Sequence, residues 1–248
     1  MRTYLLLITI LLISLVATAQ VKKPSAKTTA PAKIGVNTKK IKKTTNYGTF
    51  TDKRDGNQYK WVRIGKQVWM AENLCYLHQN LVGGDLDKGS DKGSNYEPYS
   101  YIYNYDDIDD KEANKYVQKY GVLYNWPAAK LACPQGWHLP TDAEWDILIN
   151  YLGGKEVAGG KMRMAGTTYW NSSNEFVTNS SGFSALPGGY RDCGGTFYNV
   201  GDHGYWWSAT ENDTYGAWSR YMKYNLSNVF QSLDNKSNGF SVRCVRDY

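Results

Sequence analysis

The sequence predicts an α+β fold from three observations. Helical signals occur at two places, near Pro127 and after Thr141. Runs rich in β-branched and aromatic residues stand on either side of them, as a hairpin at 59–74 and as strands from residue 182 onward. The segments between these elements are long and rich in Gly, Asp, Ser and Thr. A hairpin, two helices, long loops and a final antiparallel sheet together are typical of an α+β domain.

The first 46 residues are predicted to lie outside this domain. Residues 1–19 combine one Arg, an apolar run and the small residues Ala17 and Ala19, which is typical of a secretory signal cleaved before Gln20. The apolar run is too short for a membrane-spanning helix, so no transmembrane segment is expected after cleavage. The protein is therefore expected to be exported, to the periplasm, the cell surface or the medium.

Residues 20–46 contain eight Lys, no acidic residue and no aromatic residue. Such a segment cannot bury enough apolar surface to offset its ordering entropy, so it is predicted to be a disordered basic linker. It is either a spacer or an electrostatic tether to an anionic surface. The chain has a net charge of +6, but nine of its 29 basic residues and none of its 23 acidic residues precede Asp52. The remaining domain is slightly acidic, which argues against nucleic acid as a partner.

Residues 47–248 form the predicted domain, and they hold all four cysteines. These are Cys75, Cys133, Cys193 and Cys244. In an exported chain, four cysteines indicate two disulfides, for which three connectivities are possible. The sequence has no Cys-x-x-Cys and no Cys/His cluster at metal spacing, so no metal or other cofactor is expected.

The first half of the domain is predicted to contain a hairpin, a long loop and a short helix. The two runs in 59–74 flank Gly65-Lys66, which suits a type II′ turn. Residues 83–119 are predicted to be a solvated loop, because their acidic run at 106–110 lacks the alternating ligands of a calcium loop. Residues 121–136 then predict a short strand and a short helix, with Pro127 near the first helical position.

The strongest local signal follows His138. Thr141 is a good N-cap, and Glu144, three residues later, completes a capping box. A single apolar stripe then recurs at i, i+3, i+4 and i+7, formed by Trp145, Leu148, Ile149 and Leu152. The pattern predicts an amphipathic helix over 142–152, buried against a sheet. Asp142, Glu144 and Asp146 are expected to serve as caps or to face solvent, without a catalytic role.

After this helix, residues 153–181 are predicted to be loop. Strands are predicted at 182–191, 204–210, 217–224 and 239–247. Their aromatic residues are candidates for ligand binding, because a ring face can stack on the apolar face of a sugar. The candidates are Tyr205, Trp206, Trp207 and Trp218. The alternative for each is a place in the core, since side chains alternate between the two faces of a strand.

Six motifs in order resemble one known family. They are "VWMAENL", "YGVLYNWPAA", "CPQGWHLPTDAEWDIL", "GFSALPGGYRD", "GYWWSATE" and "GFSVRCVRD", and they resemble the Fibrobacter succinogenes major paralogous domain over residues 47–248. The resemblance implies an exported bacterial protein with a C-type lectin-like fold and no established activity. It also implies a Cys133–Cys244 disulfide, which would leave Cys75 and Cys193 as the second pair. The phrase "HLPTDAEW" is similar to one in formylglycine-generating, sulfatase-modifying enzymes, and it is interpreted as scaffold.

The function predicted from these observations is an exported, non-catalytic binding or adhesion module of a bacterial cell envelope, with an unidentified glycan or envelope protein as its partner. Calcium-dependent sugar binding at Glu211–Asp213 is disfavoured, since no Glu-Pro-Asn or Gln-Pro-Asp phrase precedes it and a turn explains those residues.

The alternative is an enzyme related to the formylglycine-generating factors. That chemistry needs a reactive cysteine pair, and two disulfides would leave no free thiol. Hydrolase motifs are absent, and His78, His138 and His203 have no companion at an informative spacing. His138 is expected to pack beside the start of the helix at 142–152.

Overall fold

The computed structural model describes residues 45–77, 93–104, 111–172 and 175–247. The predicted signal at 1–19, almost all of the linker at 20–46, His78 and the acidic run at 106–110 lie outside the described residues. None of the helices in the described ranges has the length and apolar character needed to cross a membrane.

The described ranges contain strands at both ends of the domain and helices in its middle. The strands are β1 (Tyr47–Thr51), β2 (Gln58–Ile64), β3 (Gln67–Met70), β4 (Ser100–Tyr101), β5 (Leu123–Tyr124), β6 (Trp137–His138), β7 (Gly188–Arg191), β8 (Phe197–Val200), β9 (His203–Glu211), β10 (Gly216–Lys223), β11 (Phe230–Asn235), β12 (Phe240–Ser241) and β13 (Val245–Arg246). The helices are α1 (Lys111–Tyr120), α2 (Trp126–Ala132), α3 (Asp142–Tyr151) and α4 (Lys155–Met162). The α+β class is confirmed.

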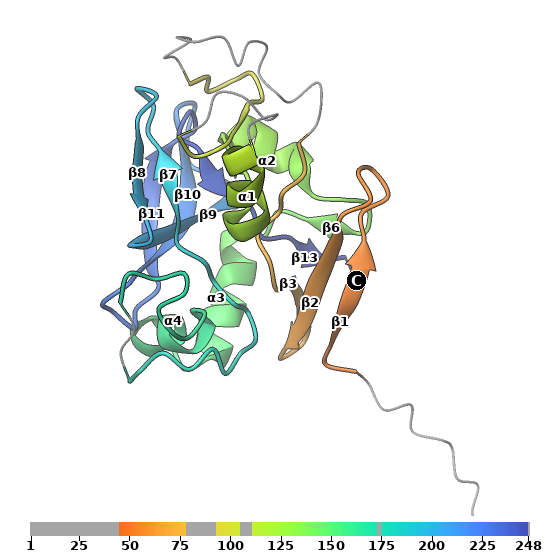
Figure 1. Cartoon of the computed structure of the whole chain (residues 1–248), viewed down its shortest axis with the longest axis vertical. Coiled ribbons are helices and arrows are strands. Elements are labelled where there is room, and N and C mark those ends of the chain that lie inside the picture. The colour runs from red at the N-terminus through yellow and green to blue at the C-terminus, as the bar shows by residue number, and fades with distance from the viewer. Residues whose placement is uncertain (1–44, 78–92, 105–110, 173–174, 248) are drawn as a thin grey trace, which may run out of the picture. The chain divides into compact units, whose positions relative to one another are not determined.

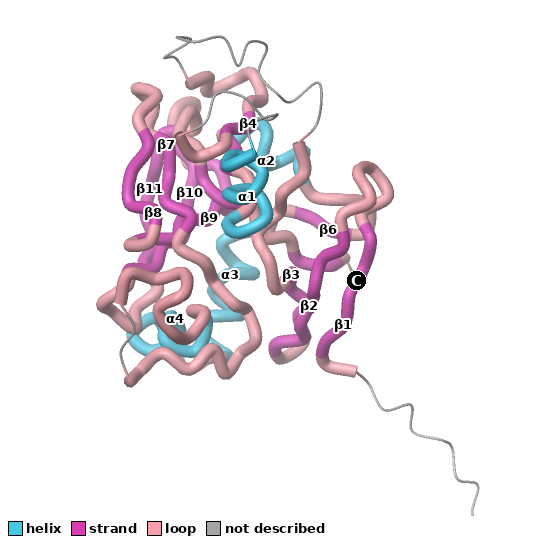
Figure 2. The backbone as a smooth tube through the Cα atoms, in the orientation of Figure 1, coloured by secondary structure: helices cyan, strands magenta, loops and turns pink. Residues whose placement is uncertain are grey.

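The strands form two sheets with α1, α2 and α3 between them, and α4 lies near one end of the eight-stranded sheet (Figures 1 and 2). One sheet has the order β1-β2-β3-β13-β6, and the other has the path β11-β10-β9-β12-β5-β4, with β7 pairing to β9 and to β8. The predicted hairpin is confirmed, since β2 and β3 pair antiparallel with Ile64 opposite Gln67. Gly65 in its turn has a φ of 59°, a left-handed conformation that suits glycine.

Two apolar cores join the sheets. The first core surrounds α2 and contains Met70 of the five-stranded sheet together with Trp207 and Phe240 of the eight-stranded one. The second core surrounds α3 and α4 and joins Trp69 to Trp206. Strand β9 therefore contributes to both cores, one on each of its faces, and this placement decides which of its aromatic residues can reach a ligand.

The two predicted helices are confirmed. Helix α3 begins after Thr141, whose hydroxyl accepts from the Glu144 amide while the Glu144 carboxylate accepts from the Thr141 amide. Helix α2 begins after Asn125, whose side chain accepts from the Ala128 amide, with Pro127 in its first turn.

Two further helices, α1 and α4, occupy segments that were predicted to be loop. Helix α4 contains two glycines, which disfavour a helix in isolation. A Cβ on Gly159 would lie 2.5 Å from the Asn228 carbonyl oxygen, and one on Gly160 would lie 2.4 Å from that of Phe176. The glycines allow neighbouring backbone to approach the helix closely, which a local pattern does not reveal.

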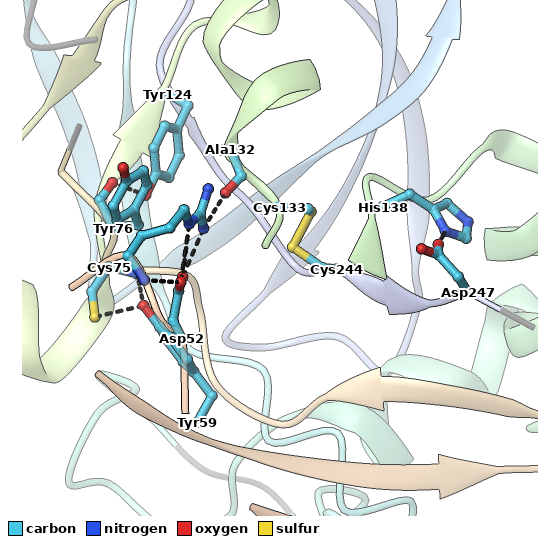
Figure 3. Close-up of a disulfide and its surroundings, with 11 residues drawn as sticks. Asp52, Tyr59, Cys75, Tyr76, Tyr124, Ala132, Cys133, His138, Cys244 and Asp247 are labelled. Atoms are coloured by element: carbon cyan, nitrogen blue, oxygen red, sulfur yellow. Dashed lines mark hydrogen bonds and ion pairs between the residues drawn. A yellow bond between two sulfur atoms is a disulfide. The ribbon is translucent and has the colours of Figure 1, made fainter. Parts of the chain in front are cut away.

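The Cys133–Cys244 disulfide implied by the family resemblance is confirmed. It joins the end of α2 to the segment between β12 and β13, with a sequence separation of 111 residues. Figure 3 shows the bond together with the Tyr59, Cys75 and Tyr124 side chains and the His138–Asp247 pair.

The implied Cys75–Cys193 pair is wrong. Both residues are free thiols. The Cys75 sulfur lies 3.1 Å from the Tyr59 hydroxyl, and Cys193 is exposed in the turn between β7 and β8. The two residues line different cavities, so they are not positioned to bond.

Candidate functional site

A row of aromatic rings crosses one face of the eight-stranded sheet. The strand register places Tyr221 of β10 opposite Phe230 of β11 and also opposite Tyr205 of β9. The ring centroids of Phe230 and Tyr221 are 4.8 Å apart, and those of Tyr221 and Tyr205 are 5.4 Å apart. Tyr205 in turn contacts Tyr190 of β7 at 4.9 Å and Phe240 of β12 at 5.1 Å. We call these five residues the aromatic row.

The aromatic row borders a cavity of about 450 Å³. Its aromatic lining comes from Tyr190, Tyr205, Tyr221, Phe240 and His203, and its polar lining comes from Asp192, Cys193, Lys223, Ser232, Asp234, Asn235 and Asn238. The volume falls in the range of about 300–1,000 Å³ that is typical of small-ligand sites. Flat apolar rings with polar groups around them are the lining expected of a sugar site.

A carboxylate without a cationic partner stands at one end of this cavity. The Ser219 hydroxyl donates to Asp234 Oδ2 at 2.6 Å. Burial raises the pKa of the Asp234 carboxyl, although hydrogen bonds from Ser219 and Ser232 act in the opposite direction. Among the described residues, no Lys, Arg or His forms an ion pair with Asp234.

The other end of the cavity carries positive charge. Lys223 Nζ lies 5.7 Å from the Tyr221 ring centroid and 5.6 Å from that of Phe230. Burial, and then the charge of Lys223, lower the pKa of His203, so this imidazole is neutral at neutral pH. Asp234 is opposite Ala217, and Lys223 is six residues further along β10. At ~3.3 Å per residue, the backbones of Asp234 and Lys223 are therefore ~20 Å apart along the strand direction.

Only Tyr205 of the four aromatic residues predicted to bind ligand lines this cavity. Trp206 and Trp207 are both fully buried, because the two cores cover both faces of β9 at these positions. Trp206 Nε1 donates to the Asn73 side chain, and Trp207 Nε1 donates to the Tyr124 carbonyl oxygen. The prediction that these two tryptophans bind a ligand is therefore wrong.

Trp218 is half-buried, and it lies on the opposite face of β10 from Tyr221, three residues away on an alternating strand. It lines neither this cavity nor the larger one described below. It serves as a reference aromatic residue for the experiments below.

The acidic turn at Glu211–Asp213 connects β9 and β10, as predicted. Asp213 Oδ1 accepts from the amides of Tyr215 and Gly216, and Glu211 pairs with Lys236. These contacts use the oxygen atoms that a cation would need. In the described ranges, no group of three or more His, Cys, Asp or Glu residues is arranged to hold a metal ion.

The expectation that Asp142 and Asp146 need only solvent is wrong. Arg220 of β10 points to α3, and its side chain is only 2 % exposed. Its guanidinium donates to Asp142 at 2.9 Å and to Asp146 at 3.0 Å. Gln231 also donates to Asp142, at 2.7 Å. The two carboxylates therefore compensate a buried cation.

His138 also has a larger role than the expected packing contact. Its ring nitrogens lie 2.7 Å from Glu144 and 2.5 Å from Asp247. Burial would lower the pKa of His138, but the hydrogen bonds to the two carboxylates outweigh it, and the pKa is raised. His138 thus links the start of α3 to the residue after β13.

A second, larger cavity of about 830 Å³ lies between β1, β2 and the end of α1. Several of its polar side chains already have protein partners. Lys60 pairs with Glu72 at 3.0 Å, and the Tyr59 hydroxyl contacts the Cys75 thiol. Asn73 donates to the Tyr120 carbonyl oxygen at 2.7 Å. The smaller cavity is the better candidate site, because aromatic rings from four strands line it beside a half-buried carboxylate that has no ion pair among the described residues.

The comparisons with known proteins agree with the motif resemblance. A family model described as the Fibrobacter succinogenes major domain matches residues 62–246. The comparisons with curated proteins and with solved structures gave no match. The matched range runs from within β2 to β13 and includes the disulfide, the aromatic row and almost all residues of both cores. The chain therefore belongs to the Fibrobacter succinogenes major domain family.

Proposed function

We propose that this protein is an exported, non-catalytic binding module of a bacterial cell envelope, and that it binds a glycan in the cavity beside the aromatic row. The observation that carries the proposal is the alignment of Phe230, Tyr221 and Tyr205 across three neighbouring strands. The rings supply flat apolar faces, and the polar residues around them can orient hydroxyl groups.

The structure also supports a C-type lectin-like fold as part of the proposal. Helices pack between two sheets, and a disulfide joins the end of α2 to the segment before β13. A long-range disulfide of this kind is typical of proteins that fold in an oxidising compartment, which supports export. N-terminal sequencing of protein from the producing cell tests export, with Gln20 expected as the first residue. Retention of Met1 would contradict it.

Binding is tested with a glycan array, followed by titration of the best ligand. Tyr205→Ala and Tyr221→Ala should each weaken binding about tenfold or more, which corresponds to about 1.4 kcal/mol. Trp218→Ala is the matched control, because it truncates an aromatic residue of the same sheet outside the cavity. This control should leave affinity within twofold. An array without any bound glycan, together with capture of an envelope protein that Tyr205→Ala does not affect, would contradict the proposal.

An enzyme of the formylglycine-generating kind would need two reactive cysteines side by side. The two free thiols, Cys75 and Cys193, line different cavities. Burial also raises the pKa of Cys75, which disfavours its thiolate. These features favour the binding module over that enzyme. Purified protein should therefore leave a sulfatase-derived cysteine peptide unchanged in the presence of copper and oxygen.

A further inference from the structure

Asp234 is half-buried and has no ion pair in the described part of the chain, unlike two other carboxylates that are removed from solvent. Asp52 pairs with Arg54 at 2.7 Å, and Asp142 pairs with Arg220 at 2.9 Å. Asp234 has only the hydroxyls of Ser219 and Ser232 as partners. A charge removed from water without a counter-ion is unfavourable, so a ligand that supplies the counter-ion gains affinity.

Three tyrosine rings share the environment of this carboxylate. The pKa values of Tyr190, Tyr205 and Tyr221 are all raised, first by burial and further by negative groups that include Asp234 and, for Tyr190, also Asp192. All three rings line the same cavity as this carboxylate. The faces of these rings carry partial negative charge, which attracts cations at close range. A carboxylate among tyrosine rings has the chemistry of a site for a protonated amine.

We propose that the cavity selects glycans that carry a free, protonated amino group, and that the amine binds at Asp234. This inference rests on the proposed function, since it names the class of glycan. An N-acetylated sugar offers a neutral amide at the same position and cannot compensate the carboxylate. A free amine forms a charge-assisted hydrogen bond, which is about twice as strong as a neutral one.

Lys223 determines the orientation of the bound glycan in the cavity. It lies at the opposite end of the cavity from Asp234, ~20 Å along β10. Its positive charge repels the amine from that end and offers a donor to hydroxyl or acidic groups. Ser232, Asn235 and Asn238 also line the cavity and can bind the hydroxyls of the amino sugar. The amine is therefore expected at the Asp234 end only.

The experiment is calorimetric titration of the purified protein with two ligands of equal length, a glucosamine tetramer and its fully N-acetylated form. At pH 6 and low salt, the glucosamine tetramer should bind at least tenfold more tightly. This preference should shrink in high salt, because ions screen the amine and the carboxylate. It should also shrink as rising pH deprotonates the amine.

Two variants test which residues cause the preference for the glucosamine tetramer. Asp234→Asn keeps the shape of the side chain and should remove the preference, while the N-acetylated tetramer still binds within about threefold of the original affinity. Lys223→Met removes a charge of the opposite sign from the same cavity and should tighten binding of the glucosamine tetramer. Denaturant unfolding of both variants verifies that they fold.

The possible failures are distinguishable. Equal affinity for the two tetramers, with both lost in Tyr205→Ala, overturns the amine inference and leaves the proposed glycan site in place. A preference that survives Asp234→Asn overturns the role of that carboxylate. Failure of both tetramers to bind, in a protein that also binds nothing on the array, overturns the inference and the proposed function together.

Discussion

On the side of β10 that faces α3, Arg220 is almost completely buried and two carboxylates of the helix hold its guanidinium. On the other side of the same sheet, Asp234 of β11 is half-buried and has no cationic partner among the described residues. The first face belongs to the core, where an unpaired charge would be costly. The second face borders an open cavity, where a ligand can supply the missing charge. The comparison separates charges that stabilise the fold from a charge that is available for recognition.

The largest expected difference between the faces comes from truncating one aromatic residue on each. Trp145 of α3 is fully buried and lies 4.9 Å from Trp69, so Trp145→Ala should cost about 3–5 kcal/mol in free energy of unfolding. Tyr221 is half-buried beside the cavity, and Tyr221→Ala should cost only about 1 kcal/mol. Denaturant unfolding measures both values. Equal losses would show that Tyr221 is as much a part of the core as Trp145.

The next largest effect should come from removing the acids that compensate Arg220. Asp142→Ala with Asp146→Ala leaves a buried, unpaired cation and should cost about 3 kcal/mol. Asp142→Ala alone should cost more than Asp146→Ala alone, because the side chain of Asp142 is 18 % exposed and that of Asp146 is 62 % exposed.

The control for this prediction replaces the cation itself. Adding Arg220→Met to the double variant should recover much of the lost stability, since no charge then remains to be compensated. If the double variant unfolds at the same denaturant concentration as the original protein, then solvent compensates Arg220 and the contrast between the faces fails.

A smaller effect is expected at His138, whose charge is compensated by Glu144 and Asp247. The pKa of His138 is raised, so its contribution to stability is complete below its ordinary value and is lost as pH rises through the raised value. The pKa of Glu144 is lowered, so the contribution of Glu144 to stability is lost only as pH falls through this lowered pKa. His138→Gln should therefore cost up to about 1 kcal/mol near pH 6 and less near pH 9. Unfolding curves at both pH values provide the test, and a larger loss at pH 9 would contradict it.

The smallest effect should have the opposite sign. The pKa of Asp234 is raised, so the folded state loses stability as pH rises from the ordinary pKa of an aspartate to the raised one. Asp234 therefore destabilises the unliganded protein at neutral pH. Asp234→Asn should therefore raise the free energy of unfolding at pH 7 by less than about 1 kcal/mol, and the gain should disappear near pH 3. A loss of stability at pH 7 would mean that Asp234 is a structural residue with a partner of its own.

The elements that the sequence predicts well are those with a complete local signal. Helix α3 has a capping box and an apolar stripe, and α2 has an N-cap followed by Pro127. Helix α4 was missed because Gly159 and Gly160 serve contacts with backbone far away in the sequence. Strand β11 was missed because it lies at the edge of the sheet, where exposed residues alternate with half-buried ones and neither set is uniformly apolar.

The candidate site was harder to predict than the fold. Tyr205 could be proposed from its strand, but its neighbours Tyr190 and Tyr221 join it only through the register of three strands. Trp206 and Trp207 were predicted incorrectly, because alternation along a strand identifies two faces and does not show that both are covered. Asp234 had no local signal, since its importance comes from the lack of an ion pair with any of the described residues.

The position of the disulfide in the sequence allows non-native disulfides to form before the native one. Cys133 pairs with Cys244, and two other cysteines, Cys75 and Cys193, precede Cys244 in the chain. A chain that enters an oxidising compartment from its N-terminus exposes three thiols before the correct partner of Cys133 arrives. Any bond formed in that interval is non-native and must be exchanged later. Replacing Cys75 and Cys193 by serine should therefore speed formation of the native disulfide in a cell without a disulfide isomerase, because only the Cys133–Cys244 bond could then form within the chain.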